Sequence, residues 1–185
     1  WRGEEGGIEA AKQNHQVIMT PGSHVYFDHS QTRNEDSVTI GGYTPLEKVY
    51  AFNPIPDELT KEEANYVLGA QANVWTEYIP TTQQVEYMIM PRMAALSEVL
   101  WLTSNPKNYK EFEKRIIKHF EFYDKKGINY SKSIFEVTSA VHPNEKGVAF
   151  ELKSPNPNGI RYTTDGSEIA NPEEIIELKQ RLFHT

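Results

Sequence analysis

The residues best suited to chemistry follow two short apolar runs. Tyr26 and Asp28 come a few residues after the run "VIMTP", while Trp75 ends the run "VLGAQANVW" and Glu77 follows it. Trp1 supplies a further indole, ahead of a segment that begins with Gly and contains good helix formers. An indole can pack on the C–H face of a sugar ring, and a carboxylate can accept hydrogen bonds from the hydroxyl groups on its rim. These five residues are therefore candidates for a sugar-binding site.

Each of these side chains also fits a purely structural role. A Trp at a strand end can fill the core, and a nearby Asp or Glu can cap a loop or be a surface charge. The repetition of an aromatic residue and an acid at successive strand ends favours binding. The residue pattern alone leaves both interpretations open.

The segments that must position these residues alternate between helix and strand. Helix formers in "GGIEAAKQNHQ" precede the apolar run "VIM", and Thr60 with Glu63 fits a capping box that opens a short helix ahead of "VLGAQANVW". Residues 29–59 are polar and rich in Gly and Pro, which is typical of a functional loop with short helical turns. Short, fully apolar strands between helices predict a buried parallel sheet. The sequence thus predicts an α/β fold for residues 1 to about 130, with reactive side chains just past the carboxyl ends of the strands.

Two longer helices are predicted after the second strand. The stretch 84–101 keeps near-helical apolar spacing, although Pro91 must kink this helix or mark an early turn. The next helix is expected to begin at Ser104 or Asn105 and to end before Gly127. Its apolar face is expected to pack in the core through Phe112, Ile116, Phe120 and Tyr123.

The composition is that of a globular protein without a membrane-spanning segment. The 185 residues are 38% hydrophobic and 24% charged, and no apolar run reaches 18 residues. The net charge is −7 and the Lys and Arg residues are scattered, which excludes nucleic acid as a partner. The absence of Cys excludes disulfides, thiolate metal sites and Cys nucleophiles. The start of the chain has neither Met nor a signal-peptide pattern, so we expect a piece of a longer protein.

From about residue 135 the pattern changes to that of a separate β module. The segments "VAFELK" and "IRYTT" are strand-like, "SPNPNG" joins them, and "TDGS" predicts a turn. The predicted organisation is an α/β unit over residues 1–134, a partial β module over 135–172, and a tail over 173–185. The tail returns to helical spacing, and its native origin is left open by the sequence.

Two stretches carry a family resemblance that covers roughly residues 1–125. "GAQANVWTEYI" followed by "VEYMIMPRMAALSEVLW" resembles the last strand and helix of the family 20 glycoside hydrolases, the β-N-acetylhexosaminidases, and "VIMTPGSHVYFD" resembles their preceding strand and loop. The resemblance implies the C-terminal portion of a (β/α)8 TIM barrel. "IRYTTDGSE" resembles the opening of the small β-sandwich that follows the barrel in many bacterial members.

The resemblance also implies a reaction. Family 20 enzymes remove terminal N-acetylglucosamine or N-acetylgalactosamine with retention of configuration, and the nucleophile is the substrate's own acetamido oxygen. Trp1 and Trp75 resemble two indoles of the pocket around the acetamido methyl group. Tyr26 resembles the Tyr whose hydroxyl aims the acetamido oxygen at the anomeric carbon. Asp28 and Glu77 resemble the acids that bind the O4 and O6 hydroxyls, and neither a metal nor another cofactor is implied.

One essential part of the family site has no counterpart here. The adjacent Asp-Glu pair that supplies the general acid lies on an earlier barrel strand, ahead of the part that Trp1 begins. Acid pairs do occur, at helix starts where solvated charges are expected: Glu4-Glu5, Asp57-Glu58 and Glu62-Glu63. We therefore expect the chain alone to be inactive. We also expect it to associate with the missing barrel half or with itself, because strands without neighbours expose apolar faces and unpaired edges.

The partners and the location follow from the same resemblance. It implies N-acetylhexosamine-terminated oligosaccharides as ligands and export of the parent protein to a periplasm or outside the cell. A rival interpretation is a non-catalytic carbohydrate-binding or interaction module. That module would share Tyr26, Asp28, Trp75 and Glu77 and would require no missing residues.

Three further polar residues are expected to have structural roles. His24 and His29 flank Tyr26 and Asp28, and such loop histidines are usually hydrogen-bonded or solvated. The sequence has no His-x-x-x-His motif and no carboxylate triad that would indicate a metal. Arg92 is expected to form a structural salt bridge with Glu86 or a neighbouring acid.

Overall fold

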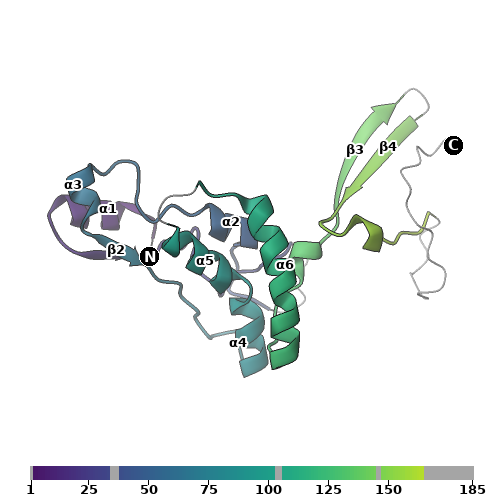
Figure 1. The fold of residues 1–185 in the computed structure, drawn as a ribbon, viewed down its shortest axis with the longest axis horizontal. Helices are drawn as coiled ribbons and strands as arrows, with labels where there is room; N and C mark the ends of the chain where they lie inside the picture. Colours follow the sequence, from purple (N-terminus) through teal and green to yellow (C-terminus); the bar gives the residue numbers. More distant parts are fainter. Residues whose placement is uncertain (1, 34–37, 103–105, 145–146, 165–185) are drawn as a thin grey trace. The chain divides into compact units, whose positions relative to one another are not determined.

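The computed structural model describes residues 2–33, 38–102, 106–144 and 147–164, and the chain divides into two compact units (Figure 1). The first unit ends at Ser133 and the second begins at Ile134. The first unit contains the strands β1 (Val17–Met19) and β2 (Val67–Ala70) and the helices α1 (Glu5–Lys12), α2 (Leu46–Ala51), α3 (Lys61–Ala64), α4 (Thr82–Ile89), α5 (Arg92–Trp101) and α6 (Tyr109–Lys126). A short 3-10 helix, η1 (Ser133–Phe135), lies at the boundary between the units.

The strands β1 and β2 pair in parallel, as predicted, and each follows a helix along the chain. The register aligns Val17 with Val67 and Met19 with Ala70. Helix α1 packs closely on β1 at Gly7, where a Cβ atom would lie 2.4 Å from the Met19 sulfur. A larger residue at position 7 would force the Met19 side chain to move.

The exposure of the two strands differs from the prediction. Their apolar sequences predicted burial on both faces, and Met19 is indeed only 2% exposed. Ile18 and Leu68, however, are 53% and 60% exposed. The sheet has two strands within the described residues, and one of its faces is open to solvent.

The region after β2 forms three helices rather than two. Pro91 separates α4 from α5, so residues 84–101 are not one helix. Of the two roles predicted for Pro91, the kink is wrong, and its position as the N-cap of α5 fits the early turn. Proline has no N–H to continue the helical hydrogen bonds, and its ring clashes with the preceding turn. The carbonyls left at the end of α4 find other donors. The Tyr87 carbonyl accepts from Gln31 Nε2 at 2.8 Å, and the Met90 carbonyl accepts from the Ser131 N–H at 3.0 Å.

Helix α6 begins later than predicted, at Tyr109. Its cap is Asn108, whose side-chain oxygen accepts a hydrogen bond from the Glu111 N–H at 3.2 Å. Asn is among the strongest N-cap residues, and Asn108 fills this role here. Gly127 ends the helix in the left-handed conformation, with φ of 66°. The predicted core face is confirmed, since the buried residues of α6 are Phe112, Ile116, Phe120 and Tyr123.

The second unit contains an antiparallel hairpin of β3 (Thr138–Asn144) and β4 (Gly147–Lys153), followed by a 3-10 helix, η2 (Pro157–Gly159). The strand predicted at "VAFELK" lies in β4 and is confirmed. The strand predicted at "IRYTT" is wrong, because residues 160–164 form no strand, and β4 pairs instead with "TSAVHPN" in β3. Neighbouring segments joined by a short connection pair most readily, which favours β3 over a later segment. The predicted turn "TDGS" reaches beyond the described residues, and the tail 173–185 lies outside them.

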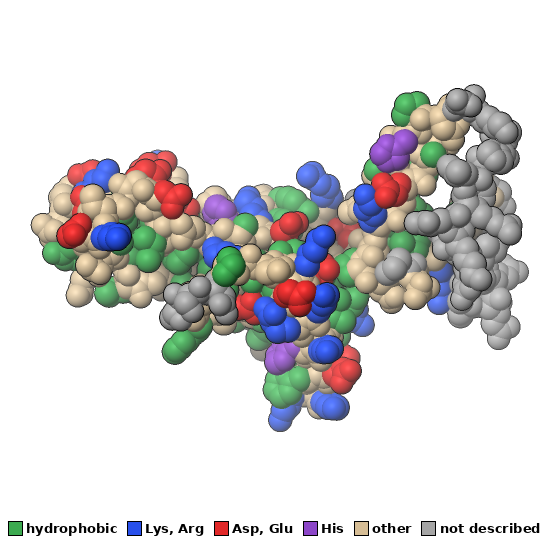
Figure 2. All heavy atoms as spheres, turned by 45° about the horizontal axis from the view of Figure 1, so that its top comes forward, with side chains coloured by type: hydrophobic (Ala, Val, Ile, Leu, Met, Phe, Trp, Pro, Cys, Tyr) green, Lys and Arg blue, Asp and Glu red, His purple; other side chains and the backbone are tan. Residues whose placement is uncertain are grey.

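The surface carries charges of both signs. Figure 2 shows acidic and basic side chains interspersed on the visible face, and ion pairs join Glu111 to Lys114 at 2.7 Å and Glu98 to Arg115 at 2.5 Å. Within the described ranges, no helix combines the length and hydropathy needed to cross a membrane.

Candidate functional site

The loops that follow β1 and β2 carry the candidate site residues. Main-chain hydrogen bonds continue the pairing beyond both strands: the Phe27 N–H donates to the Asn73 carbonyl at 2.8 Å, and the Asn73 N–H donates to the Val25 carbonyl at 2.9 Å. An isolated parallel bridge joins Tyr26 to Asn73. The two loops therefore leave the same edge of the sheet side by side, at the carboxyl ends of the strands.

Tyr26 is buried, yet its hydroxyl has no hydrogen-bond partner among the described residues. The residue is 7% exposed, and the hydroxyl oxygen itself is inaccessible to solvent. The phenol ring lies 5.6 Å from the His29 ring, measured between centroids. A buried polar group without a partner costs about 1–3 kcal/mol. Such a group is uncommon in a folded protein and is a candidate for contact with a ligand.

Asp28 shows the same feature two residues later. It is 5% exposed, and its Oδ1 has no hydrogen-bond partner among the described residues. Burial raises the pKa of the Asp28 carboxyl above its ordinary value. Its own backbone N–H, His29 and Arg92 oppose this rise of the pKa, while the Glu77 carboxylate adds to it. The charged form of Asp28 is therefore disfavoured by its burial and by the nearby Glu77 carboxylate.

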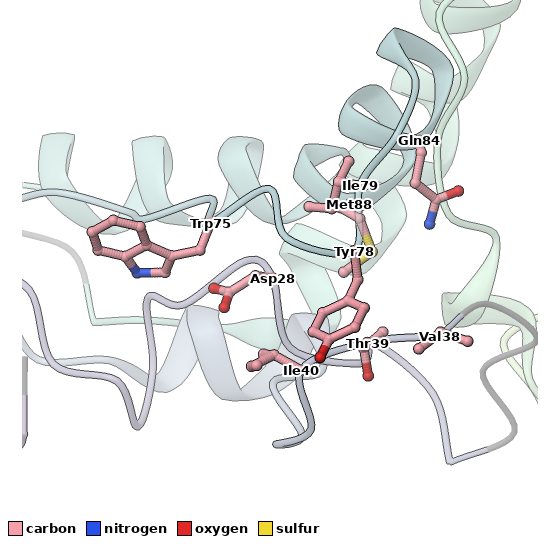
Figure 3. Close-up of a pocket in the computed structure, with 9 residues that line it drawn as sticks. All are labelled: Asp28, Val38, Thr39, Ile40, Trp75, Tyr78, Ile79, Gln84 and Met88. Carbon is pink, nitrogen blue, oxygen red and sulfur yellow. The ribbon is translucent and has the colours of Figure 1, made fainter.

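A small hollow lies between Asp28 and Trp75 on one side and the start of α4 on the other (Figure 3). Its volume is about 10 Å³, which is room for about one water molecule. Figure 3 shows Trp75 and Asp28 at one end and Tyr78 pointing toward Thr39 and Ile40. The remaining lining residues are Val38, Ile79, Gln84 and Met88. A sugar ring would therefore have to lie on the open side of Asp28 and Trp75 rather than inside this hollow.

The predicted site residues are thus only partly brought together. Asp28 and Trp75 line one hollow, and Glu77 is near enough to affect the pKa of Asp28. Tyr26 lies on the same loop as Asp28 but outside the hollow. Trp75 is 53% exposed and Glu77 is exposed as well. Trp1 lies outside the described residues, and its predicted place in the site stays a prediction.

The prediction did not include Tyr78 or the segment 38–40. Tyr78 is 46% exposed. In the sequence, only its position directly after the candidate acid Glu77 could have indicated that it lies near the site. Segment 38–40 lies in the polar loop that was predicted to be functional, but its individual residues carried no chemical signal. Val38 and Ile40 are 72% and 52% exposed, which leaves apolar surface beside the candidate site.

Arg92 has different partners from those predicted. It is completely buried, and its guanidinium donates to the carbonyl oxygens of Phe27, His29, Thr44 and Met88. The Glu86 carboxylate accepts instead from the Asn129 N–H, at 2.9 Å. The predicted salt bridge with Glu86 is therefore wrong, because the carbonyls of the loop and of the end of α4 already use the donors of Arg92.

His24 and His29 contact protein side chains, as expected for histidines with structural roles. His29 Nδ1 lies 3.0 Å from Thr44 Oγ1, and burial lowers the His29 pKa. His24 stacks on Phe52 with ring centroids 5.3 Å apart, and burial also lowers its pKa. Gly42 has a φ of +78°, and a Cβ there would lie 2.6 Å from the His29 ring. Across the part of the chain that the structure describes, no group of three or more His, Cys, Asp or Glu residues is placed to hold a metal ion.

The acid pairs lie away from the candidate site residues. Asp57-Glu58 is the only Asp-Glu dipeptide in the sequence, and both residues are exposed in a turn ahead of α3. Glu63 accepts hydrogen bonds from the Thr60 N–H within the predicted capping box, which is confirmed. The prediction of solvated charges is wrong for Glu4, which is half-buried. Burial raises its pKa, and Glu58 and Glu5 add to this effect.

The fold and these strand-end residues define a class: a parallel α/β unit whose candidate site lies at the carboxyl ends of its strands. Residues 1–104 match the family model for "Glycosyl hydrolase family 20, catalytic domain". The chain belongs to glycosyl hydrolase family 20.

Sequence similarity to individual proteins supports this assignment. The chain is similar to a "Beta-hexosaminidase" of Porphyromonas gingivalis, with 48% identity over 132 residues, which are 70% of this chain and 17% of that protein. It is also similar to a "Beta-N-acetylhexosaminidase" of Cellulomonas fimi, with 29% identity over 133 residues, 68% of this chain and 25% of that protein. The chain thus spans a quarter or less of the length of these relatives.

A solved structure supports the fold. The GH20 exo-β-N-acetylglucosaminidase of Vibrio harveyi, in complex with N-acetylglucosamine, superposes with a TM-score of 0.64 and 28% identity. The match covers 71% of this chain and 21% of the Vibrio chain. The predicted fold class is confirmed in its broader form: the first unit is part of a family 20 TIM barrel.

Proposed function

We propose that this chain is the C-terminal part of a retaining exo-β-N-acetylhexosaminidase that removes terminal N-acetylglucosamine or N-acetylgalactosamine from glycans. Membership of family 20 and the names of the relatives support the activity of the whole protein. One observation in this chain carries the proposal furthest. Tyr26 and Asp28 hold buried, unpartnered oxygens at the carboxyl edge of a parallel sheet, beside an exposed indole.

In this proposal the residues have separate tasks. The Tyr26 hydroxyl donates a hydrogen bond to the acetamido carbonyl oxygen and aims that oxygen at the anomeric carbon. Attack by this oxygen breaks the glycosidic bond and forms an oxazolinium-type intermediate, which water then opens with overall retention. Asp28 and Glu77 accept hydrogen bonds from the sugar's O4 and O6 hydroxyls. Trp75, together with Trp1, packs on the sugar around the acetamido methyl group.

The leaving oxygen must receive a proton, and we propose that no residue of this chain supplies it. The only Asp-Glu pair in the sequence is exposed in a turn ahead of α3, far along the chain from the loops of Tyr26 and Trp75. General acid catalysis contributes a factor of about 10² to 10⁴. We therefore propose that the 185-residue chain alone is inactive and that the general acid comes from a part of the barrel outside it.

A second function is favoured by one specific observation. Trp75 is 53% exposed and Glu77 is exposed, so both can meet a sugar without any further residue. A non-catalytic carbohydrate-binding module would need no more than this. The two functions share a first step, which is binding of an N-acetylhexosamine by the present chain.

Titration of the chain with N-acetylglucosamine, followed by Trp fluorescence, tests that first step. We expect a saturable change that Trp75→Phe strongly reduces, because Trp75 is one of the two indoles proposed to pack on the sugar. Trp101→Phe is the matched control: Trp101 is 84% exposed at the end of α5 and should leave the titration unchanged. Trp75→Ala is expected to weaken binding about tenfold, the size of a good aromatic contact, and this loss is measured by calorimetry because the variant lacks the reporting indole. A flat titration of the wild-type chain would refute sugar binding by this chain.

We also propose that the chain associates through the open face of β1 and β2. Ile18 and Leu68 are more than half exposed there, and a cavity of about 460 Å³ lies along β1 and the start of α1. Exposed apolar strands invite pairing with other strands, from the rest of the barrel or from a second copy. Light scattering is expected to give a mass above the 21.2 kDa of one chain. The double variant Ile18→Thr, Leu68→Thr should lower that mass, whereas Phe122→Ser on α6 should not. A monodisperse wild-type monomer would contradict the proposal.

Two further assignments remain proposals. We propose that residues 135–172 begin a small β-sandwich module, a view supported by the amphipathic hairpin of β3 and β4. On one face of this hairpin, Val141, Val148 and Phe150 are 57%, 53% and 70% exposed, as expected of a sheet that packs on another. We also propose that the parent protein is periplasmic or secreted.

A further inference from the structure

Arg92 is the largest completely buried side chain among the described residues, and its contacts are unusual. The guanidinium makes five hydrogen bonds to main-chain carbonyls. Nε donates to Met88 at 3.0 Å, Nη1 donates to His29 and to Thr44 at 3.0 Å each, and Nη2 donates to Phe27 at 2.6 Å and to Met88 at 2.5 Å. Five is also the number of N–H groups that a guanidinium carries. These five hydrogen bonds are all directed at the backbone.

These carbonyls belong to the parts that must hold Asp28 in place. Phe27 and His29 are its two chain neighbours, so the loop is fixed on both sides of the acid. Thr44 lies at the far end of the same loop, where its N–H donates to the Ser30 carbonyl at 2.9 Å. Met88 lies in the last turn of α4, ahead of the break at Pro91. One side chain therefore ties both ends of the loop to the helices.

Only arginine can make this set of contacts. Its planar fork presents donors in several directions, whereas a lysine ammonium has three donors at one point and a shorter reach. The Arg92 guanidinium carbon also lies 4.9 Å from the centre of the Phe27 ring, which adds a cation–π contact beside one of the bonded carbonyls.

We propose that Arg92 is a positioning residue for sugar binding: by holding the carbonyls of Phe27, His29 and Thr44, it keeps Asp28 at the carboxyl edge of the sheet, facing the ligand. This inference rests on the proposed function, because it takes Asp28 as a group that contacts the sugar. Arg92 itself lies beneath the loop and acts through it.

The charge of Arg92 has a second, separable effect. The groups that act on the Asp28 carboxyl are its own backbone N–H, His29, Arg92 and Glu77, and Arg92 is among those that favour the charged form. An uncharged side chain at position 92 would therefore remove both the hydrogen bonds and this charge. A lysine would remove most of the hydrogen bonds and keep the charge.

Arg92→Lys tests the positioning role, with Arg115→Lys as the matched control. Arg115 pairs with Glu98 on the helical side of the unit and contacts none of the loop carbonyls. In Arg92→Lys we expect the Thr44 amide to exchange its hydrogen about tenfold faster and the affinity for N-acetylglucosamine to fall about tenfold. The near-ultraviolet circular dichroism of the α6 aromatic residues should be unchanged. Arg115→Lys should change neither amide exchange at Thr44 nor sugar affinity.

A second variant, Arg92→Met, separates position from charge. Carboxyl-carbon nuclear magnetic resonance should show Asp28 titrating at higher pH in Arg92→Met than in Arg92→Lys, since only the methionine removes the charge. A residue needed merely for folding would not produce this difference. If Arg92→Met does not fold, the exchange rate and affinity of Arg92→Lys decide the question.

Two results would overturn the inference. One is an Arg92→Lys chain with wild-type Thr44 exchange and wild-type affinity; the other is an Arg92→Lys chain that loses the aromatic signal of α6, which would make Arg92 a general determinant of folding. If the wild-type chain binds no sugar, the proposed function fails for this chain. The Thr44 exchange rates then still show whether Arg92 holds the loop.

Discussion

Replacing Tyr26 with Phe is expected to lower the kcat of an assembled enzyme about 10²- to 10³-fold, the effect of removing one preorganised donor at a developing charge. The hydroxyl is buried and has no partner among the described residues, so its removal should leave the fold unchanged and stabilise the chain by about 1–3 kcal/mol. KM should change much less than kcat, because the bond to the acetamido oxygen strengthens as that oxygen attacks.

Measuring kcat requires a complete barrel, because the general acid is proposed to lie outside this chain. The part of this chain that aligns with the Porphyromonas gingivalis relative, at 48% identity over 132 residues, can replace the corresponding segment of that protein. Hydrolysis of an aryl N-acetylglucosaminide by this chimera gives kcat and KM. Tyr130→Phe is the control, since Tyr130 donates to Asp124 at 3.1 Å and should affect only stability. A Tyr26→Phe chimera that keeps kcat within threefold of its parent would show that Tyr26 does not position the acetamido group.

Asp28→Asn is expected to weaken sugar binding while it stabilises the chain. A hydrogen bond to a charged group contributes about 1.5–3 kcal/mol, so losing it should weaken binding roughly 10- to 150-fold. The carboxylate is buried with one unpartnered oxygen, and burial raises its pKa. The neutral amide avoids the cost of burying a charge. At pH 7 we expect a gain on the order of 1 kcal/mol, which would raise Tm by roughly 4 °C for a unit of this size.

The sign of the pH dependence follows from the direction of the pKa shift. Because the folded-state pKa of Asp28 is raised, its contribution favours folding below the unfolded-state pKa, near 3.9, and is lost as the pH rises through the folded value. The difference in Tm between Asp28→Asn and the wild-type chain should therefore vanish near pH 3 and be largest at pH 7. Sugar binding by the wild-type chain should strengthen over the same rise, as the carboxylate forms. A Tm difference that is constant from pH 3 to pH 7 would show that Asp28 titrates normally.

Several features of the fold were predictable because they depend on neighbours in the sequence. The capping box of Thr60 and Glu63, the apolar face of α6 and the stop at Gly127 are set by contacts within about four residues. The extended runs that became β1 and β2, and their parallel pairing, followed from the alternation of helix and strand. Errors arose where two local signals competed. Of several possible caps near Pro106, Asn108 is the one used, and Pro91 ended a helix instead of bending it.

The residues of the candidate site were likewise predictable only in part. Residue types and their order named Tyr26, Asp28, Trp75 and Glu77, because indoles and carboxylates past strand ends are suited to a sugar whatever the rest of the chain does. The side chains that complete their surroundings were not predictable, since Tyr78 and segment 38–40 reach the hollow only through the path of two loops.

The family, the parallel α/β character and the chemical nature of the residues past the strand ends could be predicted from the sequence, because they depend on residue type and on short-range periodicity. The role of Arg92, the burial of Asp28 and the Tyr26 hydroxyl without a partner among the described residues became known only from the three-dimensional structure. The Arg92 bonds to the loop join residues separated by 48, 63 and 65 positions along the chain. Burial and hydrogen-bond satisfaction are properties of such distant neighbours, and a local pattern of residues does not contain them.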